Sequence, residues 1–256
     1  MRKIENINYS SIALPESNDS RAHLLDVYLP DCEGFTTVMY FHGGGIINGD
    51  KADQDYLGNW FANNGIAFVT ANYRMYPQAK YPEFIEDAAE ATAWVMKNIS
   101  GYGGSGRVFV GGSSAGGYLS MMLCFDKHYL QKHGILPEDV AGYIHDAGQP
   151  TTHFNVLRER GIDHRRVIID EAAPLFHIGC SSEYAPMMII VADNDMKNRY
   201  EQTMLTLSTL RHFGYDTSKI ELKVMKNCTH TSYVSKFNDQ GESIFGSMIR
   251  DFINKF

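Results

Sequence analysis

The sequence predicts an α/β fold, in which a mostly parallel central sheet is covered by helices on both faces. From residue 37 onward, short apolar strand-like runs alternate with helix-like segments, and this alternation is typical of a parallel sheet. The candidate chemical residues also follow directly after strands, at the edge where such sheets bind ligands. The 256 residues are enough for one well-buried core, so a single domain over residues 1–256 is the simplest organisation.

The first part of the chain is predicted to hold four strands and one helix. A polar turn at residues 15–20 separates the first two apolar runs. The helix is expected from about Gln54 to Asn63, because Gly65 readily ends a helix. The predicted strands are Ile4–Ile12, Ala22–Leu29, Thr37–Phe41 and Ile66–Asn72.

The rest of the chain continues the alternation. Pro82 suits the first turn of a helix, which would carry an apolar face made of Phe84, Ala88, Ala91 and Val95. Further strands are predicted at Arg107–Gly111, Val140–Ile144, Met187–Ala192 and Ile220–Met225. Further helices are expected after Gly117, around Met204, Leu207 and Leu210 up to Gly214, and over Ile244–Ile253.

The composition excludes several classes of protein. Apolar residues make up 44% and charged residues 21%, as in a soluble globular protein. The net charge of -7 gives no basic footprint for nucleic acid or an anionic membrane. No apolar run reaches the roughly 18 residues that span a bilayer, and residues 1–9 lack the apolar stretch of a signal peptide. We therefore expect a cytoplasmic protein without nucleic-acid or membrane partners, and the sequence leaves homo-oligomer formation open.

The most informative motif is Gly112-Ser113-Ser114-Ala115-Gly116, which has the pattern G-x-S-x-G. A strand-like run precedes it and a helix-like run follows it, so Ser114 is expected on a sharp turn with its hydroxyl above the sheet. A side chain at position 112 or 116 would collide across so tight a turn. Ser114 is therefore the candidate nucleophile. The alternative is a structural serine in a glycine-rich turn.

A nucleophilic serine needs a base and an acid that orients the base. His230 follows the last predicted strand and is the candidate base. Two aspartates follow the preceding strand. Asp195 lies further into that loop and is favoured as the acid, whereas Asp193 could instead hold the loop by accepting hydrogen bonds from backbone amides. The order along the chain is thus Ser, Asp, His.

The stretch His42-Gly-Gly-Gly45 follows the third strand and is a candidate source of oxyanion donors, because glycines let backbone N–H groups turn into a cavity. Ala115, directly after Ser114, offers another N–H group. A flexible loop without a role and a phosphate-binding loop are the alternatives. A P-loop would need a following Lys-Ser/Thr pair, and the sequence has none here.

No metal or organic cofactor is expected. The four cysteines are far apart and form no C-x-x-C pair, so reduced thiols are expected rather than a disulfide framework or a zinc site. The aspartates near residue 195 do not read as a calcium loop, because Lys197 occupies the next ligand position.

Together these motifs resemble the α/β-hydrolase superfamily, and specifically its HGGG-bearing branch of hormone-sensitive-lipase-like carboxylesterases. The resemblance implies Ser114 as nucleophile, His230 as base and Asp195 as acid. It implies Gly44, Gly45 and Ala115 as the oxyanion donors. The matching positions are His42–Gly45, Tyr73-Arg74 with Pro77, Pro82 with Asp87 and Trp94, Gly112–Gly117, Asp195 and His230. Of these, Tyr73, Arg74 and Asp87 would brace two segments: the sharp turn at Gly112–Gly116, called the elbow below, and the oxyanion loop at His42–Gly45.

Two departures from the family's usual sequence narrow the kind of hydrolase that we expect. Ser113 stands where the family often has aspartate, and too little chain precedes the third strand for a large helical cap. An insertion at about residues 148–186 is long enough for a small lid. In this the chain resembles compact acetyl esterases of carbohydrate metabolism and kynurenine-formamidase-like hydrolases.

The sequence therefore predicts a serine hydrolase of short-acyl esters, with acetylated carbohydrates as one substrate class. Two alternatives stay open. The same triad would serve an arylformamidase-like amidase or a peptidase, and a hydrolase fold can also serve as a non-catalytic ligand receptor.

Overall fold

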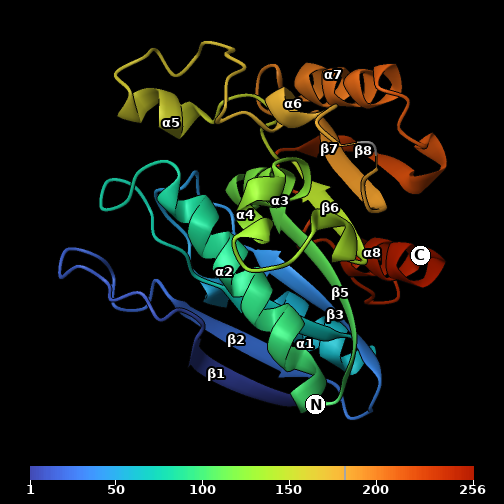
Figure 1. Ribbon diagram of the computed structural model, residues 1–256. Coiled ribbons are helices and arrows are strands. Elements are labelled where there is room, and N and C mark those ends of the chain that lie inside the picture. The colour runs from blue at the N-terminus through green and yellow to red at the C-terminus, as the bar shows by residue number, and fades with distance from the viewer. Residues whose placement is uncertain (182) are drawn as a thin grey trace.

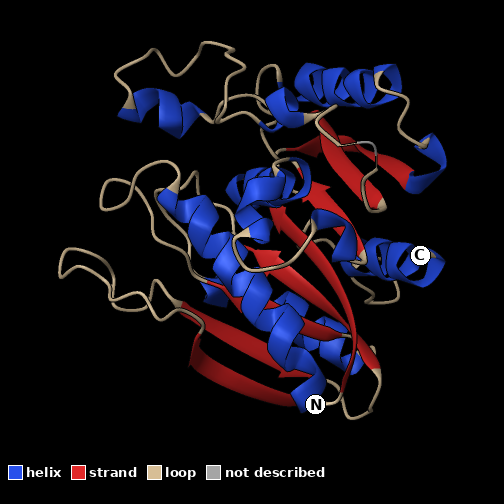
Figure 2. Cartoon of the chain, in the orientation of Figure 1, coloured by secondary structure: helices blue, strands red, loops and turns tan. Residues whose placement is uncertain are grey.

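The computed structural model describes residues 1–181 and 183–256. Eight strands in this part of the chain form one sheet in the order β1-β2-β4-β3-β5-β6-β7-β8. The two N-terminal strands pair antiparallel with their neighbours, and all pairs from β4 to β8 are parallel (Figure 2). The strands are β1 Arg2–Asn8, β2 Leu24–Leu29, β3 Phe35–Phe41, β4 Ala67–Ala71, β5 Gly104–Ser113, β6 Gly142–Asp146, β7 Met187–Asn194 and β8 Ile220–Thr229.

Helices cover both faces of the sheet, as predicted (Figure 1). The side chains of β3 show the division, because successive residues point to opposite faces. Met39 and Phe41 pack in the core beneath α2 and α3, whereas Val38 and Tyr40 pack in the core beneath α1 and α8. The helices are α1 Asp55–Asn63, α2 Glu83–Asn98, α3 Ala115–Phe125, α4 Lys127–Gln131, α5 Phe154–Glu159, α6 Pro174–His177, α7 Arg199–His212 and α8 Ile244–Lys255.

The helix predicted after Pro82 forms as α2 and buries the predicted apolar face. Its buried residues include Phe84, Ala88, Ala91 and Val95, which recur at helical spacing. The closing helix α8 is capped by Ser243, the residue before its first turn, whose hydroxyl accepts a hydrogen bond from the Gly246 amide at 3.0 Å.

Some predicted boundaries are wrong. The first strand ends at Asn8 rather than Ile12, because the amides beyond it bond to nearby side chains: the Ser10 amide donates to Oδ1 of Asn8 at 3.0 Å, and the Ile12 amide donates to Oγ of Ser10 at 3.0 Å. The chain then leaves the ladder, and the Tyr9 hydroxyl donates to the carbonyl of Asn72 at 2.9 Å. The strand expected at Val140–Ile144 is displaced, because a 3₁₀ turn over Pro137–Asp139 delays its start until Gly142.

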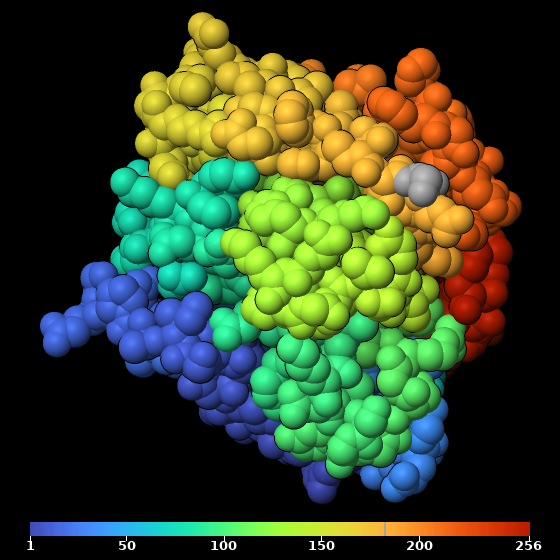
Figure 3. Space-filling view, in the orientation of Figure 1, coloured from blue at the N-terminus to red at the C-terminus, as the bar shows by residue number. Residues whose placement is uncertain are grey.

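The predicted insertion at residues 148–186 lies between β6 and β7 and carries the short helices α5 and α6; residue 182 is outside the described residues. Figure 3 shows this segment, in yellow to orange, as a layer along one end of the molecule next to α7. Residues 9–23 form a loop with turns and no helix. In its described part, the insertion therefore contributes only the two short helices α5 and α6.

Candidate active site

Ser114 lies at the sharp turn between β5 and α3. Its φ of 57° and ψ of -109° are strained for a residue with a side chain, and such strain is common at functional sites. Close packing requires the flanking glycines. A Cβ atom on Gly112 would lie 2.4 Å from the backbone carbon of Gly116, and one on Gly116 would lie 2.1 Å from the carbonyl oxygen of Phe41. The collision expected from the sequence is thus confirmed.

The structure brings Ser114, His230 and Asp195 together from three separate loops. Nε2 of His230 lies 2.8 Å from Oγ of Ser114, and Nδ1 of His230 lies 2.6 Å from Oδ1 of Asp195. An ionised carboxylate only accepts hydrogen bonds, so Nδ1 carries the proton and Nε2 is left to accept from the serine hydroxyl. This is the arrangement in which imidazole can take the serine proton.

The environment of Asp195 keeps it ionised. Its side chain is fully buried, and burial alone would raise its pKa; the hydrogen bond and charge of His230 outweigh that effect and hold the pKa below its ordinary value. The amide of Met196 adds a hydrogen bond of 2.7 Å to Oδ1. Asp195 is thus oriented by its own loop before it meets the histidine.

Asp193 lies at the end of β7 and contacts the backbone instead. Its carboxylate accepts hydrogen bonds from the amides of Asn227 at 3.0 Å and Cys228 at 3.3 Å. These amide bonds, that of Asn227 first, lower the pKa of Asp193. Because Asn227 and Cys228 lie at the end of β8, just before His230, Asp193 holds the ends of β7 and β8 together by accepting from backbone amides, which is the role that the sequence offered as its alternative.

The glycine-rich loop after β3 lies above the elbow. Gly43 is close enough that a Cβ atom on it would lie 3.3 Å from Cβ of Ser114. Gly44 and Gly45 have φ values of 106° and 67°, which favour glycine. Within the described residues, the N–H groups of Gly44, Gly45 and Ala115 donate no hydrogen bond to the protein, so they are free to bind an oxygen atom.

Comparison with known proteins places the chain in a family. A model of the family described as BD-FAE matches residues 25–157, just over half of the chain. The chain belongs to the BD-FAE family. Its matched region includes the HGGG stretch and the elbow, whereas Asp195 and His230 lie beyond it.

Curated relatives match parts of this BD-FAE chain. Esterase LipI of Mycobacterium tuberculosis is 38% identical over 96 residues, which are 37% of this chain and 30% of that protein. Mouse hormone-sensitive lipase is 33% identical over 84 residues, which are 32% of this chain and 11% of that protein. The matched segment thus spans less than a third of either relative. The resemblance to hormone-sensitive-lipase-like proteins drawn from the motifs is confirmed.

Solved structures confirm the α/β-hydrolase fold. A thermophilic esterase of Thermogutta terrifontis superposes with a TM-score of 0.73 at 19% identity, covering 98% of this chain and 90% of that one. Esterase B of Lactobacillus rhamnosis superposes with a TM-score of 0.78 at 18% identity, covering 99% of this chain and 87% of that one.

Other residues of the BD-FAE chain brace the oxyanion loop. The ring of His42 stacks on Tyr73 with 4.5 Å between centroids, and the Tyr73 hydroxyl donates to the His42 carbonyl at 3.0 Å. Nη2 of Arg74 lies 2.7 Å from Oδ1 of Asp87. Burial opposes the ionisation of Asp87, but His23, whose Nε2 lies 3.3 Å from Oδ1, and the hydrogen bonds from Arg74 outweigh it and lower its pKa. Tyr73 therefore contacts the oxyanion loop as the resemblance implied, whereas Arg74 pairs with Asp87 on α2, and the bracing role of these two residues stays a prediction.

One buried network was missed from the sequence. Asp146 ends β6 beneath the elbow and accepts hydrogen bonds from the hydroxyls of Ser113 and Tyr233. Its backbone carbonyl also accepts from the amide of Ser114 at 2.8 Å. Burial raises the pKa of Asp146 to about 6. The position of Tyr233, three residues after His230, is the one signal that the sequence offered.

This network gives Ser113 a clear role. The residue stands where related elbows often carry aspartate, and here its hydroxyl donates to a carboxylate supplied by the neighbouring strand. The Tyr40 hydroxyl lies 2.7 Å from the Ser113 hydroxyl and extends the chain of hydrogen bonds. Tyr233 connects the same carboxylate to the loop that carries His230, so the network joins nucleophile and base from below.

The described residues contain neither a cluster of metal-binding side chains nor a membrane-spanning helix. No three His, Cys, Asp or Glu side chains come together there in a way that could hold a metal ion. No helix in that part of the chain has the length and apolar content needed to cross a bilayer. All four cysteines are free thiols.

Proposed function

We propose that this protein is a serine carboxylic-ester hydrolase that acts on short-acyl esters. The observation that carries the proposal is the continuous chain from Ser114 through His230 to Asp195, with separations of 2.8 Å and 2.6 Å, next to three free backbone donors. A nucleophile, a base and an oxyanion site close to one another are the parts that acyl transfer requires.

The mechanism follows from these positions. Nε2 of His230 accepts the Ser114 proton as Oγ attacks the ester carbonyl, and the carbonyl oxygen becomes an oxyanion within reach of Gly44, Gly45 and Ala115. His230 then gives the proton to the leaving alcohol. A water molecule repeats the sequence on the acyl-enzyme, and the carboxylic acid leaves. Each of the three donors is worth roughly 3–4 kcal/mol to the transition state.

Several relatives support an ester substrate. The curated matches include an esterase and a carboxylic ester hydrolase of Mycobacterium tuberculosis. The Thermogutta esterase has been solved with propionate and with butyrate bound, and also phosphonylated by sarin. Short acids in that site favour a short acyl group here. The small lid leaves the other side of the cavity open to a bulky alcohol, for which acetylated carbohydrates are the proposed class.

The first test measures hydrolysis of p-nitrophenyl esters with acyl chains from two to twelve carbons. A maximum among the shortest chains is expected; a maximum at eight carbons or longer would contradict the short-acyl proposal. Acetylated xylo-oligosaccharides and N-formylkynurenine, assayed beside the aryl esters, separate a carbohydrate esterase from an arylformamidase.

The second test identifies the nucleophile. A fluorophosphonate probe is expected to label the wild type and the Ser113→Ala variant, and to leave Ser114→Ala unlabelled. Ser113 is the matched control because it is the neighbouring serine of the same turn, and its hydroxyl contacts Asp146 rather than His230. Ser114→Ala should lower kcat by about 10⁶. A wild type that takes no label would favour the non-catalytic receptor.

A further inference from the structure

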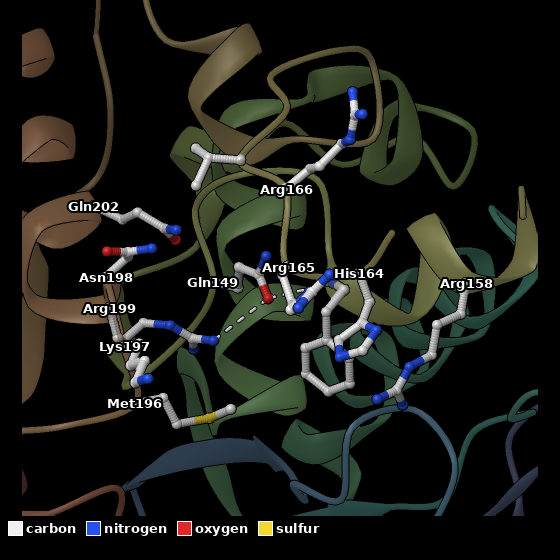
Figure 4. Close-up of a pocket in the computed structure, with 12 residues that line it drawn as sticks. Gln149, Arg158, His164, Arg165, Arg166, Met196, Lys197, Asn198, Arg199 and Gln202 are labelled. Atoms are coloured by element: carbon white, nitrogen blue, oxygen red, sulfur yellow. Dashed lines mark hydrogen bonds between the residues drawn. The ribbon is translucent and has the colours of Figure 1, made fainter. Parts of the chain in front are cut away.

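A large cavity opens beside the candidate active site (Figure 4). Its volume is about 650 Å³, and it lies between the segment after β6 and the start of α7. Two of its lining residues adjoin the catalytic groups. Phe154 would lie 3.0 Å from a Cβ atom on Gly45, and Met196 follows Asp195 directly. A substrate held at Ser114 can therefore extend into this cavity.

The cavity wall is strongly basic. Of its twelve lining residues, five are arginine or lysine and one is histidine, and none is acidic. The protein as a whole carries a net charge of -7, so its composition does not explain this concentration of positive charge. The five cationic residues are Arg158, Arg165, Arg166, Lys197 and Arg199.

Most of this charge has no carboxylate partner within the protein. Arg165 pairs with Asp163, with 2.6 Å between Nη2 and Oδ2. Within the described residues, the other four cations form no salt bridge. Arg160, on the same segment but outside the cavity wall, shows the contrast, because it pairs with both Asp170 and Glu171.

Arg199 is the most informative of the four. Its side chain is buried, with 5% of the residue exposed, and its guanidinium donates to the Ala147 carbonyl and to Oε1 of Gln149, as Figure 4 shows for Gln149. Burial lowers the pKa of Arg199 to about 10, so the group is still charged at neutral pH. A buried cation whose hydrogen-bond acceptors are both neutral is costly. The charge of Asp195 offsets that cost only in part, and an anionic ligand would offset it further.

The start of α7 adds to the same field. Asn198, Arg199 and Gln202 line the cavity from the first turn of this 14-residue helix. Its free N–H groups carry partial positive charge and favour an anion. The buried guanidinium and the helix end therefore act on the same space.

We infer that this cavity binds a carboxylate carried by the ester substrate, with Arg199 as the inner contact and Arg158, Arg166 and Lys197 as the outer ones. The inference rests on the proposed esterase activity and narrows its substrate class to esters that are themselves acidic. Planar guanidinium groups suit this assignment, because they match the geometry of a carboxylate. The cavity thus determines specificity, while the hydrolytic step stays with Ser114 and His230.

The test compares esters that differ only in charge. Two pairs are used: 4-acetoxybenzoate with 4-acetoxybenzamide, and ethyl hydrogen adipate with ethyl adipamate. The first pair carries the carboxylate in the alcohol part, the second in the acyl part. We expect kcat/KM to be about tenfold to hundredfold higher for the acidic member of at least one pair, mainly through KM.

The variants assign that preference to the cavity. Arg199→Gln, Arg158→Gln and Lys197→Gln should each lower the preference for the acidic member of the pair. The side chains of Arg158 and Lys197 are exposed, so these two variants should fold even if the buried change at Arg199 does not. Arg211→Gln is the matched control, because it removes an exposed arginine at the far end of α7.

The outcomes separate the two proposals. If the neutral esters are cleaved but the acidic ones are no better in either pair, the carboxylate inference is wrong and the esterase proposal stands. The inference also fails if all three cavity variants keep the wild-type preference. If no ester is cleaved, both proposals fail. Inorganic phosphate is added in a last control. If the enzyme does not prefer the acidic esters and phosphate changes the rates for both members of each pair equally, the cavity is a site for a free anion instead.

Discussion

The buried carboxylate of Asp146 gives a quantitative prediction about stability. Its pKa is raised by burial from 3.8 to about 6 in the folded protein. Between these two values the folded protein binds more protons than the unfolded chain, so the stability that Asp146 contributes falls as pH rises. The full difference corresponds to about 3 kcal/mol, which is lost progressively from below pH 3.8 to above about pH 6.

The perturbation is Asp146→Asn, which keeps the shape of the side chain and removes its titration. At about pH 4.5 the folded state of the wild type should be favoured by about 2 kcal/mol relative to about pH 8 through this group alone. The variant lacks that contribution. Its amide can still accept from Tyr233 and can donate towards Ser113, so it should fold and allow the comparison.

The assay is urea unfolding of both proteins at the two pH values, followed by tryptophan fluorescence or circular dichroism. The measured quantity is the change in unfolding free energy between the two pH values, wild type minus variant. Titrating groups that do not interact with Asp146 are common to both proteins and cancel, so the difference reports Asp146 together with its coupling to His230 and Asp195. A value near zero, or greater stabilisation of the wild type at high pH, would refute the view that Asp146 is held as a desolvated carboxylate.

Two further predictions concern single positions. Asp195→Asn should lower kcat by about 10⁴, because the tautomer of His230 is then no longer fixed. Asp193→Asn should keep kcat within about tenfold. Equal losses of kcat in the two variants, measured by hydrolysis of an aryl acetate, would contradict the assignment of the two aspartates. Gly116→Ala should prevent folding, since its Cβ atom would lie 2.1 Å from a backbone oxygen, and Gly101→Ala, where nothing lies within 4 Å, should change stability by no more than about 0.5 kcal/mol in thermal unfolding.

The local motifs could be predicted because each is a local backbone requirement. Gly112 and Gly116 are needed where strand and helix meet at Ser114, and Gly44 and Gly45 adopt positive φ. Such local backbone requirements can be recognised from a few consecutive residues of the sequence. The alternation of strands and helices likewise predicted the parallel sheet, and the order of strands then placed the loops of Asp195 and His230 at one edge.

The network below the elbow could not be predicted in the same way. Tyr233 and Asp146 are 87 residues apart in the sequence. Asp146 reaches Ser113 because β6 pairs with β5 in the register that places these two residues opposite each other. From the sequence alone, the acceptor for the Ser113 hydroxyl could have come from either of the two strands next to β5. Register, which depends on contacts along the whole strand, decided the partner.

The basic cavity shows the same limit and adds a further one. Its cations come from two segments more than thirty residues apart, and each segment also contains acidic residues, so the charge along the sequence averages out. Folding separates these charges: Asp163 and Asp170 pair with Arg165 and Arg160, and Asp195 turns towards His230. What remains facing the cavity is positive. The net charge predicts only that an anionic polymer is not a partner, and it does not bear on the charge of a small substrate. The charge of a site of a few hundred cubic ångströms depends on which residues lack a partner within the protein.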